Sequence, residues 1–163
     1  MDYIWTPWRY HYIATSAEVD ECVFCHILGK DPAHDSENLV LARQARTFVI
    51  LNRFPYTSGH LMVVARRHIS SLTEATTEEL NEMIDSARLS EKMLREVYRP
   101  DGFNMGFNLG KCAGAGVDGH LHLHVLPRWV GDANVVSVVG QTRVIPEELE
   151  MTFGRLSPYF QKR

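Results

Sequence analysis

At 163 residues and 45% hydrophobic content, the chain can bury one sizeable core and has little room for a second. The formal net charge of -3 gives no long-range attraction for a polyanion, so we expect no nucleic-acid partner. The sequence contains no apolar run long enough to span a membrane, and its first residues lack the basic and apolar regions typical of a leader, so we expect neither feature. We therefore expect a cytoplasmic protein without a membrane partner.

An aromatic segment opens the chain and a short helix follows it. Residues 1–20 are rich in aromatic side chains without a regular period, and we expect an arm that packs on the domain or on a partner subunit. Residues 21–163 are expected to form a single domain. At its start, the apolar stretch from Cys22 to Leu28, closed by Gly29, predicts one or two helical turns.

A hairpin and a long helix are predicted next. The segments 47–52 and 60–66 are rich in β-formers and are separated by a turn with a proline and a glycine, which favours antiparallel pairing. Thr76 and Glu79 have the spacing of a capping box. Apolar residues then recur at helical spacing as far as Pro100, so this is the longest predicted helix.

The second half of the chain predicts two more strands and a terminal helix. Residues 102–109 alternate between apolar and small or polar residues, as in a half-buried strand. A glycine-rich loop leads into a second alternating run, 120–126, which Pro127 is expected to end. Residues 146–160 predict a helix.

Three histidines alternate with leucines in the run HLHLH. A side-chain period of two places the imidazoles of His120, His122 and His124 on one face of a strand. They could simply bond neighbouring backbone groups, or they could bind a catalytic metal, although the usual companion carboxylate is missing. In the remaining interpretation, one imidazole attacks phosphorus while its neighbours support it.

The loop before this strand contains a formal G-x-G-x-x-G at Gly114, Gly116 and Gly119. A dinucleotide-binding fingerprint must open a helix, whereas this one opens a strand, so it does not predict such a fold. The glycines do allow backbone N–H groups to converge on an anion close to His122. A merely flexible connection is the alternative.

The sequence HLHLHVLP resembles the signature of the histidine-triad (HIT) superfamily. The resemblance extends to CVFCHIL near the start, to LNRFPYTSGHLMVVARRHI in the hairpin and to GFNMGFNLGKCAGAG before the triad. The segments WTPWR and HLHLHVLPRWVGDAN look most like the bacterial branch that includes diadenosine tetraphosphate phosphorylases and hydrolases. The motifs occur in the family's order over most of the chain.

The resemblance implies a role for each of four histidines. The middle histidine of the triad is the family's nucleophile, so His122 is expected to attack the α-phosphorus and form a nucleotidyl-imidazole. His124 would contact the phosphate, and His120 would support the strand or a metal site. His60 resembles an outlying family histidine that helps to orient the nucleophile.

A nucleotide site is implied by the same resemblance. Asn52 falls where the family holds the ribose hydroxyls, and Asn108 falls where a polar side chain reaches the phosphates. Phe24 and Ile27 fall where the family sandwiches the base. Phe24 and Ile27 could instead be plain core residues, and Asn52 could be a turn residue.

The implied fold is α+β and HIT-like. It has an antiparallel five-stranded sheet, a long helix and a C-terminal helix, and the sheet is expected to continue across a homodimer. One departure concerns the loop before the triad, where many relatives carry a Ser or Thr whose hydroxyl helps to bind phosphate. Here residues 115–119 contain no hydroxyl, which leaves the acceptor and the leaving group undetermined.

The spacing of Cys22 and Cys25 is that of a zinc knuckle, but a closed structural site needs four ligands. A packed thiol pair and redox chemistry are the alternatives. In zinc-bearing HIT relatives this CxxC joins two histidines, which correspond to His68 and His120. Such a structural zinc would pin the opening helix to the sheet. Cys112 receives no role.

The predicted function is that of a nucleotide hydrolase or transferase that needs no catalytic metal. The resemblance implies a purine nucleotide substrate, with adenine as the base, and cleavage at the α-phosphate of a dinucleoside polyphosphate such as diadenosine tetraphosphate. No feature of the sequence separates a hydrolase from a phosphorylase. Two alternatives are a nucleotide-binding module without turnover and a metal-dependent hydrolase that uses the histidine strand as ligands.

Overall fold

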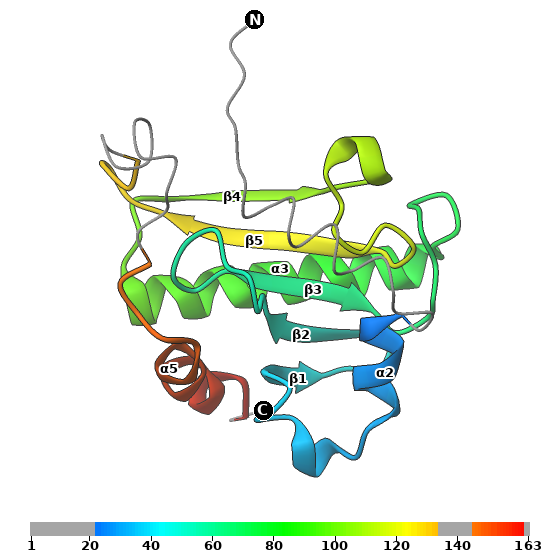
Figure 1. Ribbon diagram of the computed structural model, residues 1–163, viewed down its shortest axis with the longest axis horizontal. Coiled ribbons are helices and arrows are strands. Elements are labelled where there is room, and N and C mark those ends of the chain that lie inside the picture. Colours follow the sequence, from blue (N-terminus) through cyan, green and yellow to red (C-terminus); the bar gives the residue numbers. More distant parts are fainter. Residues whose placement is uncertain (1–21, 134–144, 162–163) are drawn as a thin grey trace, which may run out of the picture.

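A computed structural model describes residues 22–133 and 145–161 of the chain. The described residues form one five-stranded antiparallel sheet in the order β1-β2-β3-β5-β4 (Figure 1). The predicted aromatic arm at 1–20 lies outside them. The elements are α2 (Val23–Gly29), a 3-10 turn (Pro32–His34), β1 (Val40–Arg43), β2 (Thr47–Leu51), β3 (Leu61–Ala65), α3 (Thr77–Tyr98), β4 (Gly102–Phe107), a 3-10 turn (Lys111–Ala113), β5 (His122–Arg128) and α5 (Leu149–Gln161).

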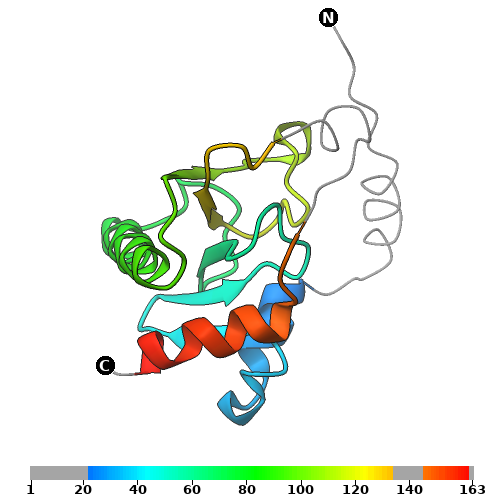
Figure 2. The ribbon, with the colours of Figure 1, turned by 90° about the vertical axis from the view of Figure 1, so that its left-hand side faces the viewer.

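Helices α3 and α5 form a layer against the sheet. The long helix α3 packs against β2, β3 and β5 on one face, and α5 packs against β1 and α3 (Figure 2). Leu121, Leu123 and Val125 are fully buried and belong to the main core. Because side chains alternate along β5, the histidines between them point to the opposite face. The α+β fold with an antiparallel five-stranded sheet agrees with the prediction.

Most predicted elements are present within one or two residues of their expected ends. The hairpin is formed by β2 and β3 in antiparallel register, with Ile50 opposite Met62. Strand β1 is missing from the residue-based prediction. It is only four residues long, Leu39 precedes it with a φ of 62°, and its register shifts between Val40 and Ala42, so no clean alternation marks it.

The prediction that Pro127 ends the histidine strand is wrong. Strand β5 begins only at His122 and runs through Pro127 to Arg128. Its pairing with β3 stops at Val125, whereas its pairing with β4 continues through Pro127. From Pro127 onward the strand therefore has a neighbour on one side only, and a proline without an N–H donor is tolerated there.

Strand β4 forms one edge of the sheet. Phe103 and Phe107 pack against the core, while Met105 and Leu109 are 42% and 41% exposed, so only part of the predicted apolar face is buried. Continuation of the sheet across a homodimer stays a prediction.

Helix α3 is fastened at its start by one carboxylate. Thr76 and Glu79 form the predicted capping box, in which the Thr76 N–H donates to Glu79 Oε2 at 2.8 Å. The guanidinium of Arg67, which follows β3, donates to both oxygens of Glu79 at 2.8 Å each. This bidentate bond and the Thr76 N–H lower the pKa of Glu79 to about 2.

None of the described helices is long and apolar enough to cross a membrane.

Acid should weaken the fold through Glu79. Because its folded-state pKa lies below the ordinary value of 4.5, its stabilising effect is complete above pH 4.5 and is lost as the pH falls toward about 2. We expect Glu79→Gln to cost roughly 1–2 kcal/mol at neutral pH, since Arg67 is half exposed to water. Urea unfolding should show this difference shrinking as the pH is lowered from about 5 to about 2.

Glu96, which is exposed on the same helix, provides the matched control as Glu96→Gln. That variant should follow the wild type at every pH. A constant difference between wild type and Glu79→Gln over the whole range would contradict the assignment.

Candidate functional site

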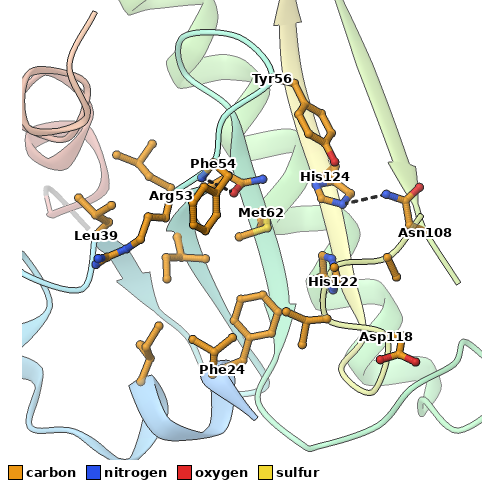
Figure 3. A pocket seen from close by; sticks show the side chains of 18 of the residues that line it. Phe24, Leu39, Arg53, Phe54, Tyr56, Met62, Asn108, Asp118, His122 and His124 are labelled. Atoms are coloured by element: carbon orange, nitrogen blue, oxygen red, sulfur yellow. Dashed lines mark hydrogen bonds between the residues drawn. The ribbon is translucent and has the colours of Figure 1, made fainter. Parts of the chain in front are cut away.

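A cavity of about 420 Å³ opens on the face of the sheet opposite α3. Its floor is a row of side chains across the sheet, because Ile50 of β2 pairs with Met62 of β3 and Met62 pairs with His124 of β5. Helix α2 forms one wall and the glycine loop forms another. Figure 3 shows Phe24 at one end of the cavity and Tyr56 at the other, with His122 and His124 between them.

The three histidines of the triad do not share one environment. His122 and His124 line the cavity, and both are largely buried. His120 precedes β5 and is only 1% exposed, and its ring lies beside Phe24 and His68 instead of lining the cavity. The alternation predicted from sequence therefore holds for the two cavity histidines, while the first histidine belongs to a second cluster.

One short hydrogen bond fixes the tautomer of His122. Its Nδ1 lies 2.6 Å from the backbone carbonyl of His120. A carbonyl can only accept, so Nδ1 carries the proton. Burial lowers the pKa of His122, which keeps the ring neutral and leaves a lone pair on Nε2. Among the described residues, Nε2 has no hydrogen-bond partner. The ring is therefore prepared to act as a nucleophile.

A chain of hydrogen bonds fixes His124 in the opposite tautomer. The backbone N–H of Tyr56 donates to His60 Nδ1 at 3.1 Å, so the proton of His60 is on Nε2. That Nε2–H donates to His124 Nδ1 at 2.9 Å. Burial lowers the pKa of His124 to about 4, so the ring is neutral and its one proton is on Nε2. His124 thus presents a donor where His122 presents an acceptor.

This places His60 against His124 and not against His122. The fully buried ring of His60 is held by the turn before β3, where Gly59 has a φ of +75°. A Cβ at that position would come within 3.0 Å of Leu94 Cδ2, so only glycine fits. The resemblance implied that His60 orients His122, and in the structure the link between these two rings runs through His124.

The predicted polar ligands both line the cavity. Asn108 directly follows β4, and its Nδ2 lies 3.3 Å from His124 Nε2. Because that Nε2 carries the proton, a turned amide would place the Asn108 oxygen there as the acceptor. Asn52 also serves as a turn residue, since its Oδ1 accepts the Phe54 N–H at 2.9 Å. Its Nδ2 lies 3.3 Å from His60 Nδ1, so it is tied to the same chain of bonds.

The remaining predicted ligands also face the cavity. Phe24 and Ile27 line it from α2, and Gly114 and Gly116 line it from the loop. Phe24 is 3% exposed and its ring lies 5.3 Å from that of His122, so it is a core residue as well as a wall. Gly114 ends the 3-10 turn with a φ of 88°, a conformation that favours glycine.

Several cavity residues escaped the sequence analysis. Arg53 and Tyr56 come from the turn between β2 and β3, and Lys111 and Asp118 come from the loop before β5. None of them belongs to a periodic pattern, because irregular segments carry no face that a period can reveal. The one available signal was their closeness in sequence to Asn52, His60 and the glycines.

A second cluster lies beside the cavity. Cys22, Cys25, His68 and His120 bring one possible ligand atom each within 4.8 Å of one another. Cys22 Sγ lies 3.2 Å from His120 Nδ1, and Cys25 Sγ lies 3.3 Å from His68 Nδ1. Such separations fit the edges of a tetrahedron around a zinc ion. Within the described part of the chain, no comparable metal-binding group includes His122 or His124.

The ring of His120 is already oriented for a metal. Its Nε2 lies 2.7 Å from the Ala65 carbonyl, so the proton is on Nε2 and the lone pair of Nδ1 points to the two sulfurs. Two of the four cluster residues belong to the start of α2, since Cys22 is its N-cap residue and Cys25 lies in its first turn. Arg43 holds the other end of α2 by donating to the carbonyls of Ile27 and Leu28.

Comparisons with known proteins agree with this geometry. The sequence model of the HIT domain matches residues 34–130. The chain is 39% identical over 157 residues to an AP-4-A phosphorylase of Mycobacterium tuberculosis, covering 91% of this chain and 79% of the relative. It is 26% identical over 121 residues to the asymmetrical bis(5'-nucleosyl)-tetraphosphatase of Schizosaccharomyces pombe, covering 74% of this chain and 63% of that protein.

A solved structure shares the fold. The crystal structure of a Zn-bound histidine triad family protein from Mycobacterium smegmatis superposes with a TM-score of 0.68 at 28% sequence identity. The match covers 86% of this chain and 93% of that one.

Proposed function

The chain belongs to the HIT family, and on that premise we propose that it transfers AMP from a dinucleoside polyphosphate to an acceptor through a nucleotidyl-histidine on His122. Diadenosine tetraphosphate is the substrate to test first. The observation that carries the proposal is the bond from His122 Nδ1–H to the His120 carbonyl, which leaves Nε2 unprotonated in the cavity wall. The names of the two curated relatives support the substrate class.

In the first step, His122 Nε2 attacks the α-phosphorus. The new N–P bond forms as the bond from phosphorus to the leaving phosphate chain breaks, and the electron pair leaves with the chain's oxygen. Charge on the transferring phosphoryl oxygens would be stabilised by His124 Nε2–H and by backbone N–H groups of the glycine loop around Gly116.

The other end of the cavity would hold the nucleoside. Phe24 and Ile27 offer apolar surface for a purine, and Asn52, which also lines the cavity, would meet the ribose hydroxyls. Because Phe24 contacts the ring of His122, base binding and the position of the nucleophile are mechanically linked. This arrangement would align the α-phosphorus with Nε2.

In the second step, an acceptor takes AMP from His122 and restores the neutral ring. Inorganic phosphate as acceptor yields ADP, whereas water yields AMP; the leaving chain from diadenosine tetraphosphate is ATP in both cases. We favour phosphate, because the relative that is 39% identical is named a phosphorylase and the 26% identical relative a tetraphosphatase.

The four-residue Cys/His cluster would hold a structural zinc. Its ligand set of two sulfurs and two imidazole nitrogens is the kind that closed zinc sites use, and the solved relative from M. smegmatis is Zn-bound. Bound there, zinc would supply a cross-link between α2, the segment after β3 and the start of β5. The cluster does not include the nucleophile, so the chemistry on phosphorus is assigned to His122.

Replacing His122 by Ala should lower kcat on diadenosine tetraphosphate by at least about a thousandfold, because no other described side chain in the cavity presents an unprotonated nitrogen for the N–P bond. The Kd for AMP, measured by calorimetry, should change by less than about tenfold. His34→Ala, at an exposed histidine outside the cavity, serves as the control and should keep full activity. Tight nucleotide binding without turnover by the wild type would instead indicate a binding module.

The acceptor can be identified from the products. With diadenosine tetraphosphate and phosphate together, we expect ADP and ATP in equal amounts, resolved by ion-exchange chromatography. ADP formation should increase with phosphate concentration, and labelled phosphate should enter the β-position of ADP. AMP and ATP at every phosphate concentration would reject the phosphorylase and leave a hydrolase.

Metal analysis tests the zinc site. Chain purified without chelator should contain about one zinc per molecule, and Cys25→Ser should lose it and melt several degrees lower, because the cross-link on α2 is gone. The exposed Cys112 provides the control, and Cys112→Ser should keep both zinc and stability. Equal metal content in the two variants, or none in the wild type after refolding with zinc, would contradict the assignment.

A further inference from the structure

We propose that Tyr56 is a substrate-binding residue, and that its hydroxyl, together with His124, forms a subsite for the phosphate chain that leaves His122 and for the phosphate that replaces it. The inference rests on the proposed function and assigns a residue that the sequence motifs did not mark. It also names the ligand class of this end of the cavity, which is a phosphate monoanion or polyphosphate.

The position of Tyr56 is fixed by the same bonds that set the histidine tautomers. Its backbone N–H donates to His60 Nδ1 at 3.1 Å, and its ring lies 4.8 Å from that of His60. The ring is stacked on His124 with an interplanar angle of 28° and a centroid separation of 6.1 Å. Tyr56 is therefore held rigidly beside the donor that faces the phosphate.

The Tyr56 side chain points toward the end of the cavity where the phosphates would lie. In Figure 3 the hydroxyl of Tyr56 lies toward His124, across from Asn108, and at the end remote from Phe24. With the nucleoside at the Phe24 end, the phosphate chain must extend past His122 and His124. The Tyr56 hydroxyl would then lie where the phosphates beyond the α-position pass.

Among the described residues that line the cavity, Tyr56 alone carries a side-chain hydroxyl. The loop from Ala115 to Gly119 offers backbone N–H groups but no hydroxyl. A phosphate chain has several charged oxygens, and each needs a donor when it leaves water. Tyr56 supplies one such donor from the opposite side of the cavity to the loop.

One subsite can serve both steps because displacement at phosphorus is in line. The leaving oxygen departs opposite His122 Nε2, and the acceptor oxygen enters from the same side. The Tyr56 O–H donates a hydrogen bond to this phosphate and keeps its proton, so no proton is transferred. The bonds made and broken remain those of the two steps described above.

Tyr56→Phe tests the proposal because it removes the hydroxyl and keeps the ring on His60 and His124. The measurement compares kcat/KM for diadenosine tetraphosphate with kcat/KM for the 4-nitrophenyl ester of AMP, whose leaving group carries no phosphate. We expect the ratio of the two constants to fall by about 10- to 100-fold, the range for one lost hydrogen bond to a charged group. The KM for inorganic phosphate should rise as well.

Tyr98 offers a matched control. Its hydroxyl bonds to Glu147 and does not line the cavity, so Tyr98→Phe should leave the ratio at the wild-type value. An unchanged ratio in Tyr56→Phe would overturn the proposal. If both constants fall by the same factor, the ratio is unchanged and Tyr56 acts only by supporting His124.

A binding experiment separates this inference from the proposed activity. In the His122→Ala background, which cannot turn over, calorimetry gives the Kd for ATP and for AMP. Tyr56→Phe should weaken ATP by about tenfold more than AMP. If the wild type shows no turnover but this difference appears, the subsite stands and the proposed reaction fails; if ATP and AMP weaken equally, the subsite fails.

Discussion

The hydrogen bond from His122 Nδ1–H to the His120 carbonyl is the constraint on which the site depends. A neutral imidazole has one donor and one acceptor nitrogen, so engaging the donor with a backbone carbonyl decides where the lone pair is. Burial keeps the ring neutral by lowering its pKa. The backbone of the triad thereby prepares its own central side chain without a carboxylate partner.

The same few residues connect the cavity to the Cys/His cluster. His120 offers its carbonyl to His122 and its Nδ1 to the two sulfurs, while its Nε2–H is held by Ala65. Helix α2 carries two sulfurs of the cluster and the Phe24 ring that borders the cavity. A change in either site therefore reaches the other through His120, just before β5, or through one turn of α2.

The regular parts of the molecule could be predicted from sequence because periods and caps are local signals. The capping box at Thr76, the alternation of leucines with histidines and the apolar hairpin each determine an element without reference to the rest. Pro127 and strand β1 could not be predicted in this way. A proline is accepted in β5 only because β3 has already ended, and β1 depends on its pairing with β2.

For the site, sequence indicated which histidines gather at the cavity and the Cys/His cluster but not how they are protonated. The donor at His124 is set by Tyr56 and His60, which come from a turn without any period. Likewise, His68 was assigned to the Cys/His cluster only through resemblance, since 43 positions separate it from Cys25. Contacts over such sequence distances arise from the packing of the sheet, and no single-sequence pattern encodes them.

Direct isolation of the covalent intermediate tests the central claim most sharply. Wild-type protein mixed with labelled diadenosine tetraphosphate in the absence of phosphate would be quenched in base, because a phosphoramidate bond is labile to acid, and then digested for peptide mass spectrometry. We predict AMP on Nε2 of His122, formed before the second product and lost on addition of phosphate. Product formation with no adduct at any time point, or an adduct on another residue, would contradict the account.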